Sequence, residues 1–415
     1  MDNSKRRNPC VEFTKETKRT HTILIPAMLD FHFPLLVCAF KAGGYKVKIL
    51  ENKGQDIISC GWEYSNNDVC FPANLIIGQF ITALKSGKFD VDKTALLLPQ
   101  TGGGCRACNY IHLLRKALLK AGYNNIPVIS LNVSGVEKHS GFKITPAMIF
   151  TACAAVFYSD LLMYLYNKIS PYEKTKSEAE RLCHLWEHRI SKGFSKGKFI
   201  SPMAMIRLFD DITKSFAEIE TEKKAVKKIC ITGELYIKFC SLGNNNLEQT
   251  LRNNDCEIYM GGFTQYMMYL IDCCTADDKL YNRFSLSGQG AKILVRYLNF
   301  LQTEMNKALE NAGFEPATDY LTLKKNCSWA GSFGKTMGDG WLISAEIIDA
   351  LDRGVKSAVV AVPFGCLVSH TCARGAINKI RKRHPEAVIH ALDFDSGLSK
   401  INQYNRIQMI LNFTK

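Results

Sequence analysis

Short runs of hydrophobic residues, each about as long as a buried strand, alternate in this chain with longer segments whose apolar residues recur at helical spacing. In the first third, the runs at 22–26, 46–50, 94–99 and 126–131 predict four strands. The segments between them predict helices, among them 34–43, 72–86 and 108–121. Alternation of strand and helix is typical of a parallel sheet with helices on both faces.

The strand signal stops and later returns, which divides the chain into three parts. From residue 145 to 226 the pattern is helical, first apolar and then charged and amphipathic. Strand-like runs reappear at 228–232, 257–260, 357–362 and 387–392, with a helical insert at about 277–313 and a last helix at 401–411. We therefore expect an α/β domain over 1–144, a helical connector over 145–226 and a second α/β domain over 227–415.

Composition and charge narrow the class of protein. The 415 residues are 47% hydrophobic and 22% charged, which is typical of a folded globular protein and excludes a disordered one. Polar residues interrupt the apolar run at 144–166, and the first eight residues are charged or polar. We therefore expect no membrane span, no secretory signal and a cytoplasmic protein. The net charge of +14 comes mostly from scattered lysines and arginines without a nucleic-acid motif, so we expect no nucleic-acid partner.

The chain has 16 cysteines, which in a cytoplasmic protein favour metal or redox chemistry over disulfides. Cys70, Cys105 and Cys366 fall in loops that lead into predicted helices, and the last two directly follow predicted strands. Ligands of open parallel sheets collect beyond the carboxyl ends of the strands. Because a helix N-terminus favours negative charge, we expect lowered pKa values for these three thiols. They could converge on one metal cluster.

Other cysteines and the glycine run have plainer interpretations. A lone cysteine is most often a small buried hydrophobic residue, which we expect of Cys38, Cys153, Cys183, Cys230 and Cys240. Cys105 and Cys108 form a CxxC pair, typical of a redox dithiol or half of a zinc site, but no second CxxC completes a zinc ribbon. The glycine run at 102–104 lacks the ending of a P-loop and the spacing of a dinucleotide fingerprint.

Seven motifs are spread over most of the chain. They are Gly61-Trp62, Asn66-Asn-Asp-Val-Cys-Phe-Pro-Ala73, Gln100-Thr-Gly-Gly-Gly-Cys-Arg-Ala107, Gly338-Asp-Gly-Trp341, Pro363-Phe-Gly-Cys366, Asp393-Phe-Asp-Ser-Gly397 and Asn402-Gln-Tyr-Asn-Arg-Ile407. Together they resemble the acyl-CoA dehydratase activase-related proteins, relatives of the 2-hydroxyacyl-CoA dehydratase subunits. The resemblance implies two Rossmann-like (flavodoxin-like) domains with a [4Fe–4S] cluster, or a related double-cubane cluster, between them.

The resemblance also implies ligands and a partner. Cys70, Cys105 and Cys366 are the implied thiolate ligands of the cluster, Cys108 is either an extra ligand or a buried thiol, and His370 is a loop residue near the cluster. Three thiolates leave one iron open to another ligand. The implied partner is an ATP-hydrolysing activase with its own iron–sulfur cluster. Four basic residues could guide this partner to the protein: Lys379, Arg381, Lys382 and Arg383. The alternative is that they form an ordinary solvent-exposed surface.

The cysteine pattern and the family resemblance are compatible with two functions. In the first, the protein accepts low-potential electrons from the activase and reduces or dehydrates a substrate, such as a 2-hydroxyacyl-CoA thioester, at the cluster between the domains. In the second, it is a noncatalytic electron-transfer or metal-binding partner. The sequence leaves the substrate, the fourth ligand and the oligomeric state open, including a dimer.

Overall fold

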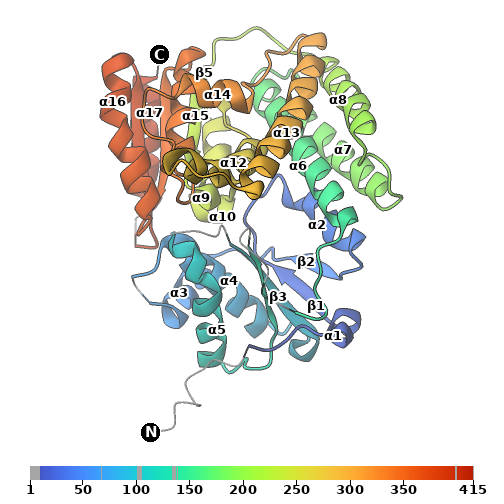
Figure 1. Cartoon of the computed structure of the whole chain (residues 1–415). Coiled ribbons are helices and arrows are strands. Elements are labelled where there is room, and N and C mark those ends of the chain that lie inside the picture. The colour runs from blue at the N-terminus through green and yellow to red at the C-terminus, as the bar shows by residue number, and fades with distance from the viewer. Residues whose placement is uncertain are drawn as a thin grey trace.

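The computed structural model describes residues 10–414 except 67, 101–104, 133–136, 138 and 398–399. Two parallel four-stranded sheets are flanked by helices, which confirms the α/β class and two Rossmann-like domains (Figure 1). The first sheet contains β1 (Thr22–Ile25), β2 (Val47–Ile49), β3 (Thr94–Gln100) and β4 (Val128–Asn132). The second contains β5 (Lys227–Gly233), β6 (Cys256–Tyr259), β7 (Ser357–Pro363) and β8 (Val388–Phe394). Every strand lies within two residues of a predicted run.

The two sheets have the same strand order, β2-β1-β3-β4 in the first and β6-β5-β7-β8 in the second. All pairs are parallel, and their crossovers are helical. Strand β7 is buried along its whole length, because it lies inside the second sheet. In both sheets, the chain leaves the first and third strands at neighbouring positions, which is the topological switch point where such folds bind ligands.

The helices of the first domain are α1 (Lys15–Thr20), α2 (Phe33–Ala42), α3 (Gln55–Tyr64), α4 (Phe71–Lys85) and α5 (Tyr110–Lys120). The pattern predicted α2, α4 and α5 but not α3. Glycines allow α3 and α4 to pack closely, because a Cβ atom at Gly61 would clash with the Asn74 carbonyl oxygen and one at Gly78 with that of Ile57.

The connector and part of the crossover from β6 to β7 form one helical layer, the green and light-orange helices at the upper right of Figure 1. The connector contains α6 (Pro146–Ile169), α7 (Glu178–Phe194) and α8 (Pro202–Ala217), and the crossover contains α12 (Phe263–Leu280), α13 (Leu286–Asn311), α14 (Tyr320–Asn326) and α15 (Leu342–Asp352). Helix α8 packs on α13, and α6 packs on α12. Buried side chains of this layer join those of the second sheet in one core.

Helix α6 is the one helix in the described part of the chain that is long and apolar enough to cross a membrane. Of its most apolar window, 72% is buried inside the protein. This helix therefore packs as a core helix, and most of its apolar side chains are buried, apart from exposed ones near its start such as Ile149 and Phe150. That packing agrees with the expectation that the chain does not span a membrane.

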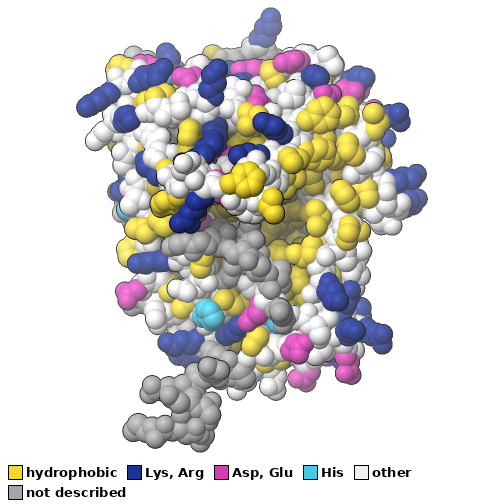
Figure 2. Space-filling view, viewed as in Figure 1, with side chains coloured by type: hydrophobic (Ala, Val, Ile, Leu, Met, Phe, Trp, Pro, Cys, Tyr) yellow, Lys and Arg dark blue, Asp and Glu magenta, His cyan; other side chains and the backbone are white. Residues whose placement is uncertain are grey.

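The remaining helices surround the second sheet. They are α9 (Leu235–Phe239), α10 (Ser241–Asn244), α11 (Leu247–Arg252), the π-helical turn η4 (Ser369–Arg374), α16 (Gly375–Arg383) and α17 (Lys400–Phe413). Figure 2 shows lysine and arginine side chains spread over the visible face, with no continuous basic stripe, and hydrophobic side chains gathered near α13. On that helix, Leu286 and Ile293 are exposed.

A buried carboxylate links the first domain, the connector and the β6–β7 crossover. The Asp160 carboxylate on α6 lies 2.7 Å from Nε2 of His32, which precedes α2. It also accepts hydrogen bonds from the backbone N–H groups of Phe263 and Thr264 at the start of α12. Because both His32 and Asp160 are buried, these bonds hold the three parts in a defined arrangement.

Candidate metal centre

A cleft between the two domains brings the three predicted cysteine ligands together. Cys105 follows β3, Cys366 follows β7, and Cys70 directly precedes α4. All three line the same cleft, which encloses about 470 Å³ free of protein atoms, part of it open to solvent. The cleft lies beyond the carboxyl ends of β3, β5 and β7, as expected for an open parallel sheet.

The three cysteine loops are connected to one another. The Arg106 guanidinium donates a hydrogen bond of 2.6 Å to the Asp68 carbonyl oxygen, which joins the Cys105 loop to the Cys70 loop. Across the domain boundary, the Phe71 N–H donates to the Phe364 carbonyl oxygen at 3.0 Å. Gly365 has φ +71°, and a Cβ atom there would lie 3.2 Å from the Cys70 Cα atom. The backbones of the two domains are therefore in close contact beside the cysteines.

Hydrogen-bond donors accompany two of the three sulfurs. Cys70 is 6% exposed, and its Sγ atom lies 2.6 Å from the Tyr110 hydroxyl oxygen. Cys366 is 8% exposed, and its Sγ atom accepts from the Ser369 hydroxyl at 3.1 Å and from the Ser369 N–H at 3.4 Å. Ser369 belongs to η4, a π-helical turn of the kind that is frequent at functional sites. Such donors stabilise a thiolate and tune a bound metal.

The expectation that helix N-termini lower the pKa values of these thiols is wrong. Burial raises the pKa of Cys70 to about 11 and that of Cys366 to about 12, and it also raises the pKa of Cys105. The hydrogen bonds from Tyr110 and Ser369 act in the opposite direction but are outweighed by burial. Binding of a metal here therefore has to displace protons from sulfur.

Two carboxyl groups share the cleft, and the residue-by-residue reasoning from the sequence missed both. Glu234 directly follows β5, and its carboxylate accepts a hydrogen bond of 3.0 Å from the Ile237 N–H at the start of α9. Asp339 is 6% exposed and makes no hydrogen bond or ion pair with another side chain in the part of the chain described. Burial raises the pKa of Glu234 to about 7 and, together with the Glu234 charge, raises that of Asp339 well above its usual range.

The position of each carboxyl group in the sequence could have indicated that it lies at the site. Glu234 stands at the end of a predicted strand, where ligand-binding groups collect. Asp339 lies in the motif Gly338-Asp-Gly-Trp341, in which both glycines have positive φ, +52° and +44°. A Cβ atom at Gly340 would clash with the Lys335 carbonyl oxygen and the Tyr269 hydroxyl. The tight turn that these glycines allow presents Asp339 to the cysteine cleft.

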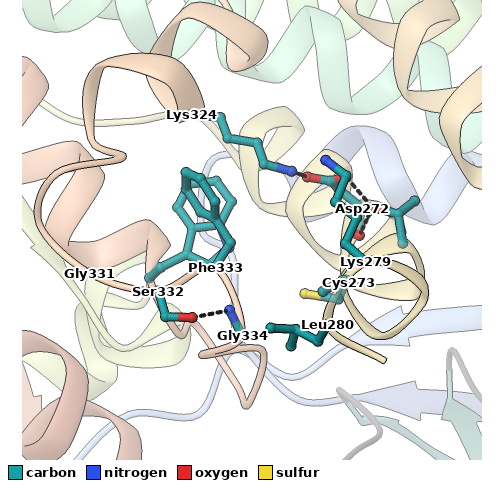
Figure 3. Close-up of a pocket in the computed structure, with 12 residues that line it drawn as sticks. Asp272, Cys273, Lys279, Leu280, Lys324, Gly331, Ser332, Phe333 and Gly334 are labelled. Carbon is teal, nitrogen blue, oxygen red and sulfur yellow. Dashed lines mark hydrogen bonds and ion pairs between the residues drawn. The ribbon is translucent and has the colours of Figure 1, made fainter. Parts of the chain in front are cut away.

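The same turn presents Trp341 to a second cavity, shown in Figure 3. This cavity holds about 760 Å³ free of protein atoms, part of it open to solvent. Phe333 lies on one side, and Cys273 and the ion pair between Asp272 and Lys324 lie on the other. Its lining combines the apolar side chains of Ala276, Leu280, Phe333 and Trp341 with the cations of Lys279 and Lys324, which suits an organic molecule more than a metal ion.

Other residues singled out in the sequence do not line the cysteine cleft. Cys108 is half-buried in the short helix η3 (Arg106–Asn109), and His370 is exposed, with Nδ1 2.7 Å from the Cys366 carbonyl oxygen. The basic run Lys379, Arg381, Lys382 and Arg383 is exposed at the far end of α16, where Arg381 donates to the Ile389 carbonyl oxygen and Arg383 lies over the Trp329 ring. Of the cysteines expected to be buried, all are buried except the half-buried Cys153.

The donor set of the cleft fits an iron–sulfur cluster. Among the described residues, no three His, Cys, Asp or Glu side chains stand close enough to hold a single metal ion. A cluster spreads its ligands over a larger span, and thiolates are the ligands that such clusters prefer. The cleft is lined by three thiols and two carboxyl groups, and Arg106 is the one cation that lines it in the described structure. A cationic occupant would therefore stabilise the negative charge that these groups can develop.

Comparison with known proteins does not assign a family to the chain: no protein-family model and no curated protein matches it.

Proposed function

We propose that this chain is an iron–sulfur protein of the 2-hydroxyacyl-CoA dehydratase type. In this proposal, Cys70, Cys105 and Cys366 hold a [4Fe–4S] or related double-cubane cluster in the cleft between the domains. An ATP-hydrolysing activase with its own cluster supplies low-potential electrons, which are used to reduce or dehydrate a bound substrate. The motifs shared with the acyl-CoA dehydratase activase-related proteins support the proposal.

One observation supports this proposal most strongly: three cysteines from three separate loops and two domains line one cleft. A buried cysteine that only fills space has no need to sit at a strand end. Here Cys105 and Cys366 both follow the third strand of their sheet, at the switch point where such folds bind ligands.

The side chains around the cleft have distinct tasks in this proposal. When bound, the cluster supplies one-electron chemistry at low potential. Tyr110 and Ser369 donate hydrogen bonds to the Cys70 and Cys366 sulfurs and so reduce the negative charge on them. Burial of both thiols excludes water from the ligands, which also affects the potential.

The cavity of Figure 3 supports a catalytic use of the electrons over simple relay. It is larger than the cysteine cleft, and one turn, Gly338 to Trp341, borders both. An organic substrate with an apolar part would contact Phe333, Trp341 and Leu280, with Lys279 at the edge available to an anionic group. Its reacting end would then point toward the turn that carries Asp339.

The test is ATP-dependent reduction of the anaerobically purified protein. Iron and sulfide are quantified first, and EPR spectra identify the cluster. The protein is then mixed with a dithionite-reduced activase, with and without ATP, while the cluster spectrum is followed. We expect bound iron and sulfide, and reduction that requires both activase and ATP. Equal reduction without ATP or without activase would contradict the electron-acceptor function and favour the noncatalytic alternative.

A further inference from the structure

The two domains place corresponding residues at the cleft. In the first domain, α4 leads into the third strand, β3, and Cys70 lies just before α4. In the second domain, α15 leads into the third strand, β7, and Asp339 lies two residues before Trp341, the N-cap of α15. Cys105 and Cys366 follow those third strands. Each domain therefore contributes one residue before the helix and one residue after the strand.

The two positions also share one backbone hydrogen bond, although Cys70 is the extended N-cap of α4 and Asp339 lies in a turn. The Cys70 carbonyl oxygen accepts a hydrogen bond of 3.0 Å from the N–H of Ala73, three residues further on. The Asp339 carbonyl oxygen accepts one of 3.0 Å from the N–H of Leu342, again three residues further on. Both side chains line the cysteine cleft. Asp339 therefore lies near the start of the helix that precedes the third strand, as Cys70 does in the first domain, but two residues further from that helix.

We propose that Asp339 is the fourth ligand of the cluster and binds, through a carboxylate oxygen, the iron that the three cysteines leave open. The inference rests on the proposed function, because it needs a cluster bound to Cys70, Cys105 and Cys366. It adds the residue that completes the site and makes the four ligands two from each domain.

Two further observations favour Asp339 over the other groups near the cleft. It is 6% exposed, and its carboxyl group hydrogen-bonds to its own backbone N–H but to no other side chain among the described residues. Glu234 lines the same cleft, but its carboxylate holds the Ile237 N–H at the start of α9. Cys108 does not line the cleft. A buried carboxyl group with no side-chain partner would gain a partner by binding iron.

The chemistry of a carboxylate gives the fourth iron a distinct property. Oxygen is a harder donor than thiolate sulfur and is a poorer match for iron in a sulfide-bridged cluster. The iron bound to Asp339 is therefore the most easily exchanged of the four. A substrate held in the neighbouring cavity could displace this carboxylate without disturbing the three thiolates.

The experiment compares iron content and EPR spectra of wild type, Asp339→Asn, Asp339→Cys and the matched cleft variant Glu234→Gln, all purified anaerobically as the full chain. After mild ferricyanide oxidation we expect Asp339→Asn to fall from about four to about three irons per cluster and to show a [3Fe–4S] signal. Asp339→Cys and Glu234→Gln should keep about four. Wild-type protein labelled with [4-¹³C]aspartate should show a ¹³C ENDOR coupling at the reduced cluster, which protein labelled with [5-¹³C]glutamate should lack.

The outcomes separate this inference from the function on which it rests. Four irons and unchanged spectra in Asp339→Asn, or loss of the fourth iron in Glu234→Gln instead, would overturn the Asp339 assignment while leaving the cluster in place. Absence of iron and sulfide from the wild-type protein would overturn both. If Asp339→Asn does not fold, the labelled wild-type protein decides: no aspartate coupling means that Asp339 is not a ligand.

Discussion

The two α/β domains share a strand order, yet the edges at which they meet differ in chemistry. The first domain contributes two thiols to the cleft, Cys70 and Cys105, whereas the second contributes one thiol, Cys366, and two carboxyl groups, Glu234 and Asp339. The fold provides equivalent positions in each domain, and the side chain at each position decides what that edge can bind.

The difference is clearest after the first strand of each sheet. β1 is followed by Pro26, which has no ionisable group, and β5 is followed by Glu234. The negative charge that the cleft can develop therefore comes unequally from the two domains. Changes on the first-domain side should mainly affect the retention of iron, and changes on the second-domain side should also affect charge and pH dependence.

The largest effect is expected from removing a first-domain sulfur. Cys105→Ser should abolish or greatly reduce bound iron, because a serine oxygen replaces a thiolate ligand at a strand end. Cys153→Ser, a change of the same chemistry on the half-buried side of α6, should leave the iron content intact. The measurement is iron and sulfide quantitation of the two variants after anaerobic purification. Equal iron in the two variants would contradict the assignment of Cys105.

Removing a carboxyl group from the second domain should change the pH dependence of stability in metal-free protein. The raised pKa of Glu234, about 7, means that folding favours its protonated form. Its contribution to stability is complete below the unfolded-state pKa near 4.5 and is lost as the pH rises through 7. Glu234→Gln should therefore raise the free energy of unfolding at pH 8 by on the order of 2 kcal/mol and have little effect at pH 4.

Chemical denaturation of both proteins at the two pH values provides the measurement. Glu222→Gln, at an exposed carboxylate outside the cleft, serves as the control and should leave the free energy of unfolding unchanged at both pH values. A Glu234→Gln variant that is less stable than wild type at pH 8 would show that the charged form of Glu234 is favoured by folding, contrary to this expectation.

A smaller effect is expected where the domains touch. Gly365→Ala places a Cβ atom 3.2 Å from the Cys70 Cα atom and 3.3 Å from the Val69 carbonyl oxygen, in addition to the strain of a positive φ. Gly122→Ala has the same kind of backbone strain, φ +85°, but meets no atom within 4 Å. Both should lose about 1 kcal/mol of stability from the backbone. Gly365→Ala alone should also lose iron faster to a chelator, measured from the decay of cluster absorbance.

The smallest effect concerns the hydrogen bonds to sulfur. Tyr110→Phe removes a donor from the Cys70 sulfur in the first domain, and Ser369→Ala removes one from the Cys366 sulfur in the second. Both should lower the reduction potential by tens of millivolts, because each donor stabilises the more negative, reduced state. Redox titration followed by EPR measures the shifts. Because the backbone N–H of residue 369 still donates to the Cys366 sulfur in Ser369→Ala, Tyr110→Phe should show the larger shift in reduction potential.

The sequence predicted the strands well because parallel, two-sided burial requires continuous hydrophobic runs. The run at 357–362, for example, is the fully buried β7. Helix α3 was missed because it buries only Ile57 and Gly61 and so has little apolar periodicity. The helices between β6 and β7 begin at Phe263, earlier than the insert expected from 277, because α12 follows almost directly after the strand.

The candidate site was only partly predictable for a different reason. The positions of Cys70, Cys105 and Cys366 could be predicted because thiolates bind metals and these three lie beside predicted strands or helices, whereas nothing in the sequence distinguishes Tyr110 and Ser369 from similar residues elsewhere. The pKa values of the thiols were predicted with the wrong sign because burial depends on how the two domains close over the cleft. Part of the motif around Cys105, residues 101–104, lies outside the described residues.

The contact of the Cys70 and Cys366 loops across the domain boundary has a consequence for biosynthesis. The two cysteines are separated by about 300 residues, and the Phe71 N–H donates a hydrogen bond to the carbonyl oxygen of Phe364, which is synthesised that much later. At about 5–20 residues per second, the ribosome needs roughly 15–60 s to cover that distance. During this interval the thiols of the nascent first domain lack the cover of the second. If the protein binds a cluster as proposed, we therefore expect its insertion to follow synthesis of the Cys366 loop, and the yield of loaded protein to depend strongly on keeping oxygen away during synthesis.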